Sequence, residues 1–375
     1  MNHLAFMAHI QAADEADRPA LLMEFSLAQL PEKLHAALRA AAVPHWFDHA
    51  FLNTLLRDGP LNESEFRELT SLSFVKAFPN RGWNVHEHTR IPLLQRLWQE
   101  DRARYQEISR LAVEYGEAQD PDDSAWCIET VFHRLIADSD QGKSEVIRIG
   151  WQWQNSPNFA YDRVELLARA AREQLDAGRL SERSTSWTLF WEAHLDKIYS
   201  RNREAKDKLL QIRVEPERDS YNAANRLKAL GYVHLRLSET TEARGRYEQA
   251  LPLYQAIGCR LSEANCIRAL GDVHLRLSET AKARGRYEQA QRIYHAIGQP
   301  LGKADSLRVF GNLAVHTGDY DAAHRYLAQA SAQFESVGCR EGVAECLEGF
   351  GSVYTAEEKL AEAADAWAQA ALLYE

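Results

Sequence analysis

A repeat of 40 residues in the last part of the chain constrains the fold more than any other feature. The segment Ala229–Ala250 reads ALGYVHLRLSETTEARGRYEQA and Ala269–Ala290 reads ALGDVHLRLSETAKARGRYEQA, so 19 of 22 positions match. Three columns of small residues continue at this offset through four repeats, as in a stacked array. They are Gly231, Gly271, Gly311 and Gly351; Ala243, Ala283, Ala323 and Ala363; and Ala250, Ala290, Ala330 and Ala370.

The spacing inside each repeat predicts two helices joined by a short turn. Apolar residues follow helical spacing on both sides of the break at Ser238–Thr240. A helical hairpin of this kind cannot bury its apolar face alone, so neighbouring hairpins are expected to stack into a solenoid. Gly258, Gly298 and Gly338 stand where each second helix should end.

The Leu-Gly pair, the two alanine columns and the bulky residue between them resemble the tetratricopeptide repeat. The period of 40 resembles the variety of that family with longer helices. We therefore predict an all-α fold, a right-handed α-α superhelix, with a small winged-helix domain at its N-terminal end. The four repeats are predicted at 225–264, 265–304, 305–344 and 345–375, after irregular helical hairpins at 101–224.

The resemblance implies that the first helix of each repeat lines a concave groove that holds a peptide. One cation per repeat, at Lys228, Arg268 and Arg308, forms a ladder that predicts an acidic protein segment as ligand. Glu345 and Glu348 break this ladder in repeat four, and a solvated face of mixed charge is the alternative. The predicted groove residues are Asn225, Lys228, Tyr232, Asn265, Arg268, Asp272, Arg308 and Asn312, with Asp305, Arg236 and Arg276 close by.

Residues 31–100 have the order of elements of a winged helix: three helices, a β-hairpin and a further helix. We predict a winged-helix-like domain there, preceded by a helical extension at 1–30. The β-prone runs are separated by Pro-Asn-Arg-Gly, a turn sequence. The expected elements are helices at Pro31–Val43, Phe47–Arg57, Asn62–Leu72 and Ile91–Trp98, and strands at Phe74–Phe78 and Trp83–Glu87.

The segment Val85–Arg90, VHEHTR, resembles the Met-His-Asp motif that ends the winged helix of STAND-class signalling ATPases. His86 matches the histidine, while Val85 and Glu87 replace the other two residues. The resemblance implies that His86 senses the phosphates of a bound nucleotide. The domain order also resembles the C-terminal half of bacterial members of this class, whose nucleotide domain would here be absent or supplied in trans.

Charge disfavours nucleic acid as a partner. The third helix of the predicted winged helix carries Glu63, Glu65 and Glu68 against Arg67 alone, and carboxylates repel phosphates. The whole chain has a net charge of −10, so no global basic field would attract DNA or an anionic membrane. A winged-helix DNA-binding regulator therefore remains only a second alternative.

The stretch Ala137–Ser144, ADSDQGKS, matches a permissive P-loop pattern. A working P-loop follows a buried strand, but the preceding residues have helical spacing, and two aspartates in the loop would repel a triphosphate. We predict a loop between two helices instead, with Gly142 at the turn and Ser144 capping the second helix.

No other catalytic or metal-ligating pattern is present. We predict that His234 and His274, which share one repeat column, pack in the core, and that the five cysteines are unpaired. We therefore predict a non-enzymatic cytoplasmic scaffold or adaptor of bacterial signalling or defence, without cofactor or metal. Its partner would be a protein or acidic peptide, with self-association through the C-terminal repeat and no membrane contact; the sensor half of a STAND-type NTPase is the first alternative.

Overall fold

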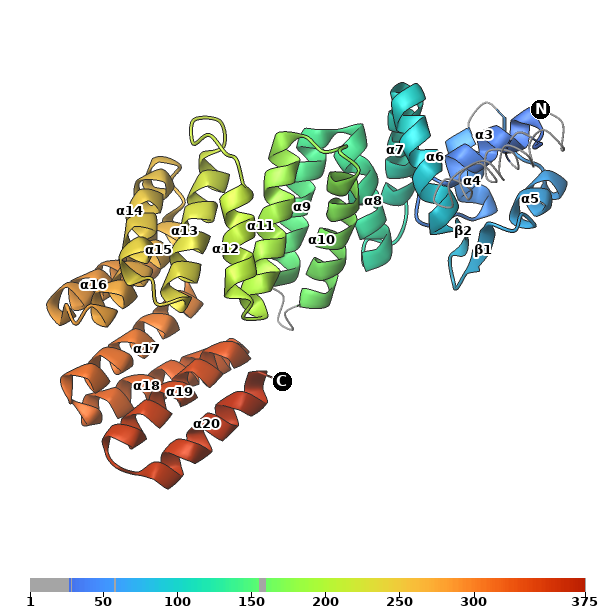
Figure 1. The fold of residues 1–375 in the computed structure, drawn as a ribbon. Helices are drawn as coiled ribbons and strands as arrows, with labels where there is room; N and C mark the ends of the chain where they lie inside the picture. The colour runs from blue at the N-terminus through green and yellow to red at the C-terminus, as the bar shows by residue number, and fades with distance from the viewer. Residues whose placement is uncertain (1–26, 28, 57–58, 155–159, 375) are drawn as a thin grey trace, which may run out of the picture. The chain divides into compact units, whose positions relative to one another are not determined.

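The computed structural model describes residues 27, 29–56, 59–154 and 160–374, and these residues are almost entirely helical (Figure 1). The helical extension predicted at 1–30 lies almost wholly outside them. The chain forms two compact units: one runs to Gln154 and includes Tyr161–Thr188, and the other consists mainly of the residues from Leu189 onward. No helix in the described ranges is long and apolar enough to cross a lipid bilayer.

From Glu32 onward, the described part of the first unit has three helices, a β-hairpin and a fourth helix, in the predicted order. The strands are antiparallel, with Val75 opposite Val85 and Phe78 opposite Gly82. The identification of this region as a winged helix stays a prediction. The elements are α3 (Glu32–Ala41), α4 (His49–Leu56), α5 (Glu63–Thr70), β1 (Val75–Phe78), β2 (Gly82–Val85) and α6 (Glu87–Glu100).

Capping residues set the boundaries of two of these helices. The Asn62 side chain accepts from the N–H groups of Ser64 and Glu65, and the Glu65 carboxylate accepts from the Asn62 N–H, a complete capping box for α5. The prediction that the second strand extends to Glu87 is wrong. His86 caps α6, so the helix already begins at Glu87.

Further helices complete the first unit, and α11 continues into the second. Helical spacing predicts that Ala125–Ile136 is helix and not strand, and the structure confirms this. The helices are α7 (Arg102–Glu117), α8 (Ser124–Ala137), α9 (Ser139–Gln154), α10 (Tyr161–Asp176) and α11 (Glu182–Ile198).

The predicted position of the turn in ADSDQGKS is wrong. The junction between α8 and α9 is Asp138, whose carboxylate accepts from the N–H of Gln141. Gly142 lies inside α9 and allows it to approach α8, because a Cβ there would lie 2.6 Å from the Leu135 nitrogen. Ser144 is also helical and donates to the Asp140 carbonyl. The segment is helix packed on helix, without the strand that a P-loop requires.

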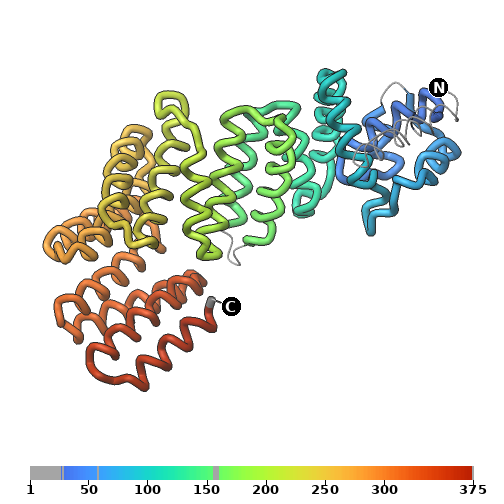
Figure 2. Tube along the Cα trace, in the orientation of Figure 1, coloured from blue at the N-terminus to red at the C-terminus, as the bar shows by residue number. Residues whose placement is uncertain are grey.

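The second unit continues with α12 and then four helical hairpins, each packed against the next (Figure 2). The first helix of each hairpin begins about one turn before the predicted start of its repeat. The columns of small residues mark only the closely packed middle of these helices. The elements are α12 (Asn202–Gln211), α13 (Ser220–Arg236), α14 (Thr240–Ala256), α15 (Arg260–Arg276), α16 (Thr280–Ala296), α17 (Pro300–Thr317), α18 (Tyr320–Ser336), α19 (Arg340–Ala356) and α20 (Leu360–Tyr374).

The turns between hairpins have the predicted glycines. Gly258, Gly298 and Gly338 have φ of 70°, 66° and 70°, in the left-handed region that favours glycine. Inside each of the first two hairpins, Ser238 and Ser278 take the same conformation, with φ of 64° and 60°. The fold is therefore a helical solenoid, as the repeat predicts.

Small residues face bulky ones inside each hairpin. Gly231 lies against the buried ring of Tyr247, and Gly271 against that of Tyr287. A Cβ on Gly271 would lie only 2.4 Å from Cε1 of Tyr287. The glycine column is thus explained by close helix packing.

Alanine at two glycines of the same hairpin should have opposite effects. Gly271→Ala should lower the free energy of unfolding by about 1–3 kcal/mol through overpacking against Tyr287. Gly285→Ala, in α16 where a Cβ would meet no atom within 4 Å, should raise it by ~0.5–1 kcal/mol because alanine favours the helix. Urea unfolding followed by circular dichroism measures both, and equal stabilisation by the two changes would contradict this packing.

Candidate functional site

The candidate site is the outward side of the first helices α13, α15, α17 and α19, named here the first-helix face. Tyr232 of α13 is 40% exposed on it. Burial is the main cause of the raised pKa of the Tyr232 hydroxyl.

Two asparagines predicted to meet a peptide are already bonded to tyrosines. The Tyr254 hydroxyl donates to Oδ1 of Asn225 over 2.8 Å, and Tyr294 donates to Asn265 over 2.6 Å. Asn225 is buried. These residues join the second helix of one repeat to its own first helix, a contact that the sequence register does not reveal because the partners are 29 residues apart.

The two arginines of the predicted ladder have acidic partners, and their role in holding a peptide stays a prediction. Arg268 lies 2.8 Å from an Asp272 oxygen and 2.7 Å from an Asp305 oxygen of the next repeat. Arg308 in turn donates to Asp305 over 3.0 Å and lies 3.1 Å from Glu345. The acidic side chains stand between the arginines and neutralise them, so the ladder is a mixed-charge network.

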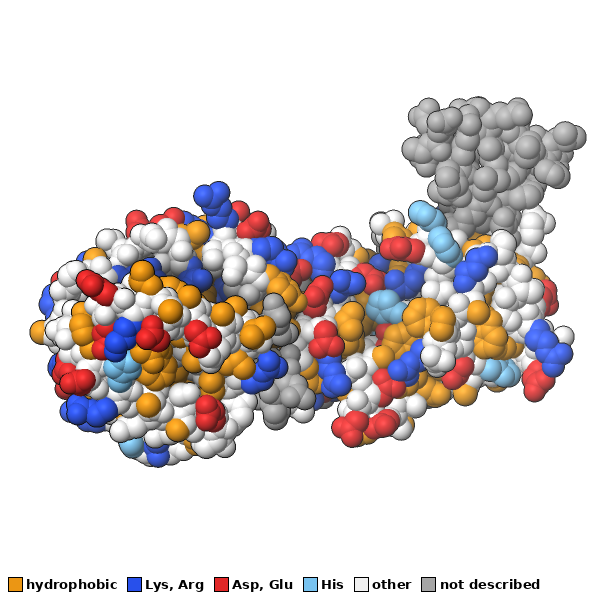
Figure 3. All heavy atoms as spheres, turned by 90° about the horizontal axis from the view of Figure 1, so that it is seen from below, with side chains coloured by type: hydrophobic (Ala, Val, Ile, Leu, Met, Phe, Trp, Pro, Cys, Tyr) orange, Lys and Arg blue, Asp and Glu red, His pale blue; other side chains and the backbone are white. Residues whose placement is uncertain are grey.

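The remaining predicted positions on this face differ in exposure. Asn312 is half-buried, and its backbone carbonyl accepts from His316. Arg236 and Arg276 are both exposed, and Arg276 also donates to the Leu235 carbonyl over 3.0 Å. Cationic and acidic side chains lie interspersed on the side of the second unit drawn in Figure 3.

His234 and His274 are buried, as predicted, but they are not simple packing groups. Each Nδ1 contacts the glutamate at the N-cap position just before the following helix, Glu239 or Glu279; the second pair is 2.6 Å apart. The histidine column therefore joins the two helices of a hairpin across their turn. No group of three His, Cys, Asp or Glu side chains in the described parts of the chain could hold a metal ion.

In the VHEHTR segment, Arg90 has more contacts than His86. His86 is exposed and accepts from the His88 N–H at 3.4 Å. Arg90 is buried and donates to the carbonyls of Ala42 and Val43 over 2.9 and 3.2 Å. A nucleotide-sensing role of His86 stays a prediction.

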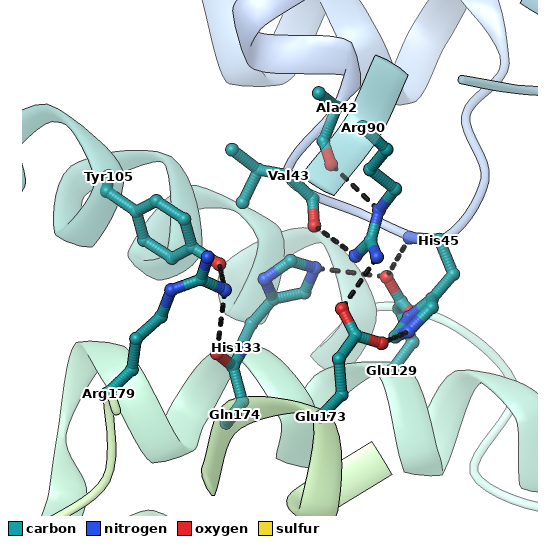
Figure 4. A network of polar contacts seen from close by, with 10 residues as sticks. All are labelled: Ala42, Val43, His45, Arg90, Tyr105, Glu129, His133, Glu173, Gln174 and Arg179. Atoms are coloured by element: carbon teal, nitrogen blue, oxygen red, sulfur yellow. Dashed lines mark hydrogen bonds and ion pairs between the residues drawn. The ribbon is translucent and has the colours of Figure 1, made fainter. Parts of the chain in front are cut away.

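A partly buried ionic network, which the sequence does not predict, lies in the first unit (Figure 4). His45 is at its centre: Nδ1 contacts Glu129 over 2.7 Å, and Nε2 contacts Glu173 over 2.8 Å. Glu129 is 2% exposed and also contacts His133 of its own helix over 3.1 Å. Arg90 donates to the other oxygen of Glu173 over 2.6 Å. The network joins the α3–α4 connection to α6, α8 and α10.

The carboxylates fix the protonation state of this network. Burial alone would lower the pKa of His45, but Glu129 and Glu173 outweigh it and raise that pKa to about 9. Burial would conversely raise the pKa of Glu173, yet His45 and Arg90 lower it to about 2. At neutral pH, His45 is thus a cation between two anions. This arrangement holds helices together; it presents no free acid or base to a substrate.

A second set of polar contacts lies beside it in Figure 4. Arg179 donates to the Tyr105 hydroxyl over 3.1 Å and to Gln174 over 3.3 Å. Burial raises the pKa of Tyr105 above its usual value. These contacts tie α7 to the end of α10, so polar groups as well as apolar ones bind the helices of the first unit.

Comparison with known proteins bears on the second unit most directly. A tetratricopeptide repeat family model matches residues 221–296. No curated protein sequence matches the chain significantly. Among solved structures, a Rap protein complexed with Competence and Sporulation Factor has a TM-score of 0.53 at 14% identity, over 75% of this chain and 74% of that one.

A second similar structure is a STAND protein with a tetratricopeptide repeat sensor from Pyrococcus horikoshii. It has a TM-score of 0.44 at 14% identity, and the match covers 94% of this chain and 58% of that one. The family match and the Rap structure agree with the helical hairpins seen here. The chain contains tetratricopeptide repeats within an α-helical solenoid.

Proposed function

We propose that this protein is a non-enzymatic interaction scaffold that binds a peptide or protein segment along the first-helix face. The observation that carries the proposal is the family match to hairpins whose first helices present exposed and half-buried polar positions, Tyr232 and Asn312 among them. The solved Rap protein with this type of fold is complexed with Competence and Sporulation Factor. A role in bacterial signalling or defence belongs to the same proposal.

Capture from a lysate of the native host tests the site as well as the activity. The variant Tyr232→Ala/Asn312→Ala removes two proposed contact groups without breaking an ion pair. Because loss of central contacts weakens binding strongly, the amount of captured partner should fall at least about tenfold. Arg284→Glu, on the exposed side of α16, is the matched control and should retain the partner fully. Equal retention by all three proteins, quantified by mass spectrometry, would place the binding surface elsewhere.

The order of three helices, hairpin and helix in the first unit supports a second candidate, the sensor half of a STAND-type NTPase. In that case His86, exposed at the start of α6, would face a nucleotide domain from another chain. An ATPase that is encoded beside this protein and co-purifies with it would favour this candidate.

A further inference from the structure

Two lysines, one on the first-helix face and one beside it, differ from the arginines of that face in having no acidic partner. Lys197 lies in the last turn of α11, and its Nζ is 4.9 Å from the centre of the Tyr232 ring. Lys228 of α13 lies with its Nζ 5.6 Å from the centre of the Tyr254 ring. Neither ammonium group is within ion-pair distance of a carboxylate in the ranges that the structure describes.

The surroundings of the two lysines are basic. Burial, followed by the charge of Lys228, lowers the pKa of Lys197 to about 8. His194, one turn before Lys197, has its pKa lowered by burial and by both lysines. Arg268 also acts on Lys228 and lowers its pKa, in addition to burial. Half-buried cations that repel one another are a site at which an anion would be stabilised.

We propose that Lys197 and Lys228 together bind a carboxylate of the protein segment held on the first-helix face, beside the exposed ring of Tyr232. This assignment rests on the proposed function and names the chemistry of one subsite within it. Arg268 and Arg308, whose charges are neutralised by Asp272, Asp305 and Glu345, hold neighbouring repeats together instead. The lysine pair is therefore the group that selects an acidic residue.

The test uses the full chain and a random dodecapeptide library displayed on phage. Selection on the wild-type protein at pH 7 should enrich one acidic position, and Lys197→Met/Lys228→Met should abolish that preference while still enriching peptides. Lys282→Met, which removes an exposed lysine of α16, should leave the preference unchanged. Methionine retains an apolar chain of similar length and removes the repulsion, so the double variant should melt no lower than the wild type.

Affinities of one enriched peptide then test the contact itself. Fluorescence anisotropy should show at least about tenfold weaker binding to the wild-type protein when the acidic residue of the peptide is replaced by the neutral amide. The double lysine variant should bind the acidic and the amide peptide equally well. Because only the protonated Lys197 attracts a carboxylate, affinity should be nearly full at pH 7, fall to about half at pH 8 and be up to about tenfold lower at pH 9 than at pH 7. Cys266, the nearby thiol, has its pKa raised to about 12 by burial and does not titrate in this range.

The outcomes separate the subsite from the proposed function. Enrichment of peptides without an acidic preference, or with the same preference in the double lysine variant, overturns the lysine site and leaves peptide binding standing. If the wild-type protein enriches no more peptides than Tyr232→Ala/Asn312→Ala does, both the lysine site and the proposed peptide binding are overturned. Tighter binding of a phosphoserine peptide than of the acidic one overturns the assignment to a carboxylate.

Discussion

Replacing Glu129 by alanine is expected to lower the free energy of unfolding of the first unit by about 3–5 kcal/mol, the usual cost of breaking a buried ion pair. Glu129 contacts both His45 and His133 and is 2% exposed. Its loss would leave His45 with Glu173 as its only carboxylate and His133 without its acceptor. Hydrogen exchange of the amides in α8 and α10 measures this free energy locally.

The control is a glutamate in an exposed ion pair of the same unit. Glu63 contacts Arg67, and both side chains are more than three-quarters exposed. Glu63→Ala should change the free energy of unfolding by less than about 1 kcal/mol, because water and salt screen such a pair. A similar small effect of Glu129→Ala would mean that the buried network does not hold the helices together.

Replacing Tyr287 by alanine is expected to lower the free energy of unfolding of the second repeat by ~3–5 kcal/mol, as for other buried aromatic residues. The ring fills the space opened by Gly271, and the hydroxyl donates to Asp272 over 2.8 Å. Because each hairpin contacts mainly its neighbours, the loss should spread to the first and third repeats before the fourth. Hydrogen exchange along α13–α20 would show that order.

Two further variants distinguish the contribution of the Tyr287 ring to stability from that of its hydroxyl and from that of an exposed aromatic ring. Tyr287→Phe retains the ring and loses only the hydrogen bond, so its cost should be about 1 kcal/mol. Tyr326→Ala removes a ring of α18 that is 37% exposed and should cost far less than Tyr287→Ala. If Tyr287→Phe proved as destabilising as Tyr287→Ala, the hydroxyl and not the ring would hold the hairpin.

The solenoid could be predicted from sequence because its determinants are local and repeated. The glycine column at Gly231 and Gly271 reports close packing, and Gly258 and Gly298 end helices through a backbone conformation that few other residues adopt. The same reasoning found the helices and the hairpin of the first unit. It erred by a few residues where a side chain such as Asp138 or His86 capped a helix.

The charged contacts could not be predicted, since they join residues that sequence spacing does not relate. Glu129 and Glu173 are 84 and 128 residues from His45. Asp305 was known to share a face with Arg268 and Arg308, but its position between them depends on how one repeat rotates on the next. Sequence therefore indicated which residues share the candidate site and could not show which of them neutralise one another.

Because the first two repeats are nearly identical in sequence, the contacts inside them are equivalent. Tyr254 meets Asn225 as Tyr294 meets Asn265, and the His-Glu contact across the turn is the same in both hairpins. Each of these interfaces aligns only the two helices that it joins. No contact within this pair of hairpins therefore depends on how many repeats precede or follow it. The number of repeats in such an array is set by how many copies the gene encodes, whereas the geometry of each interface is set by its residues.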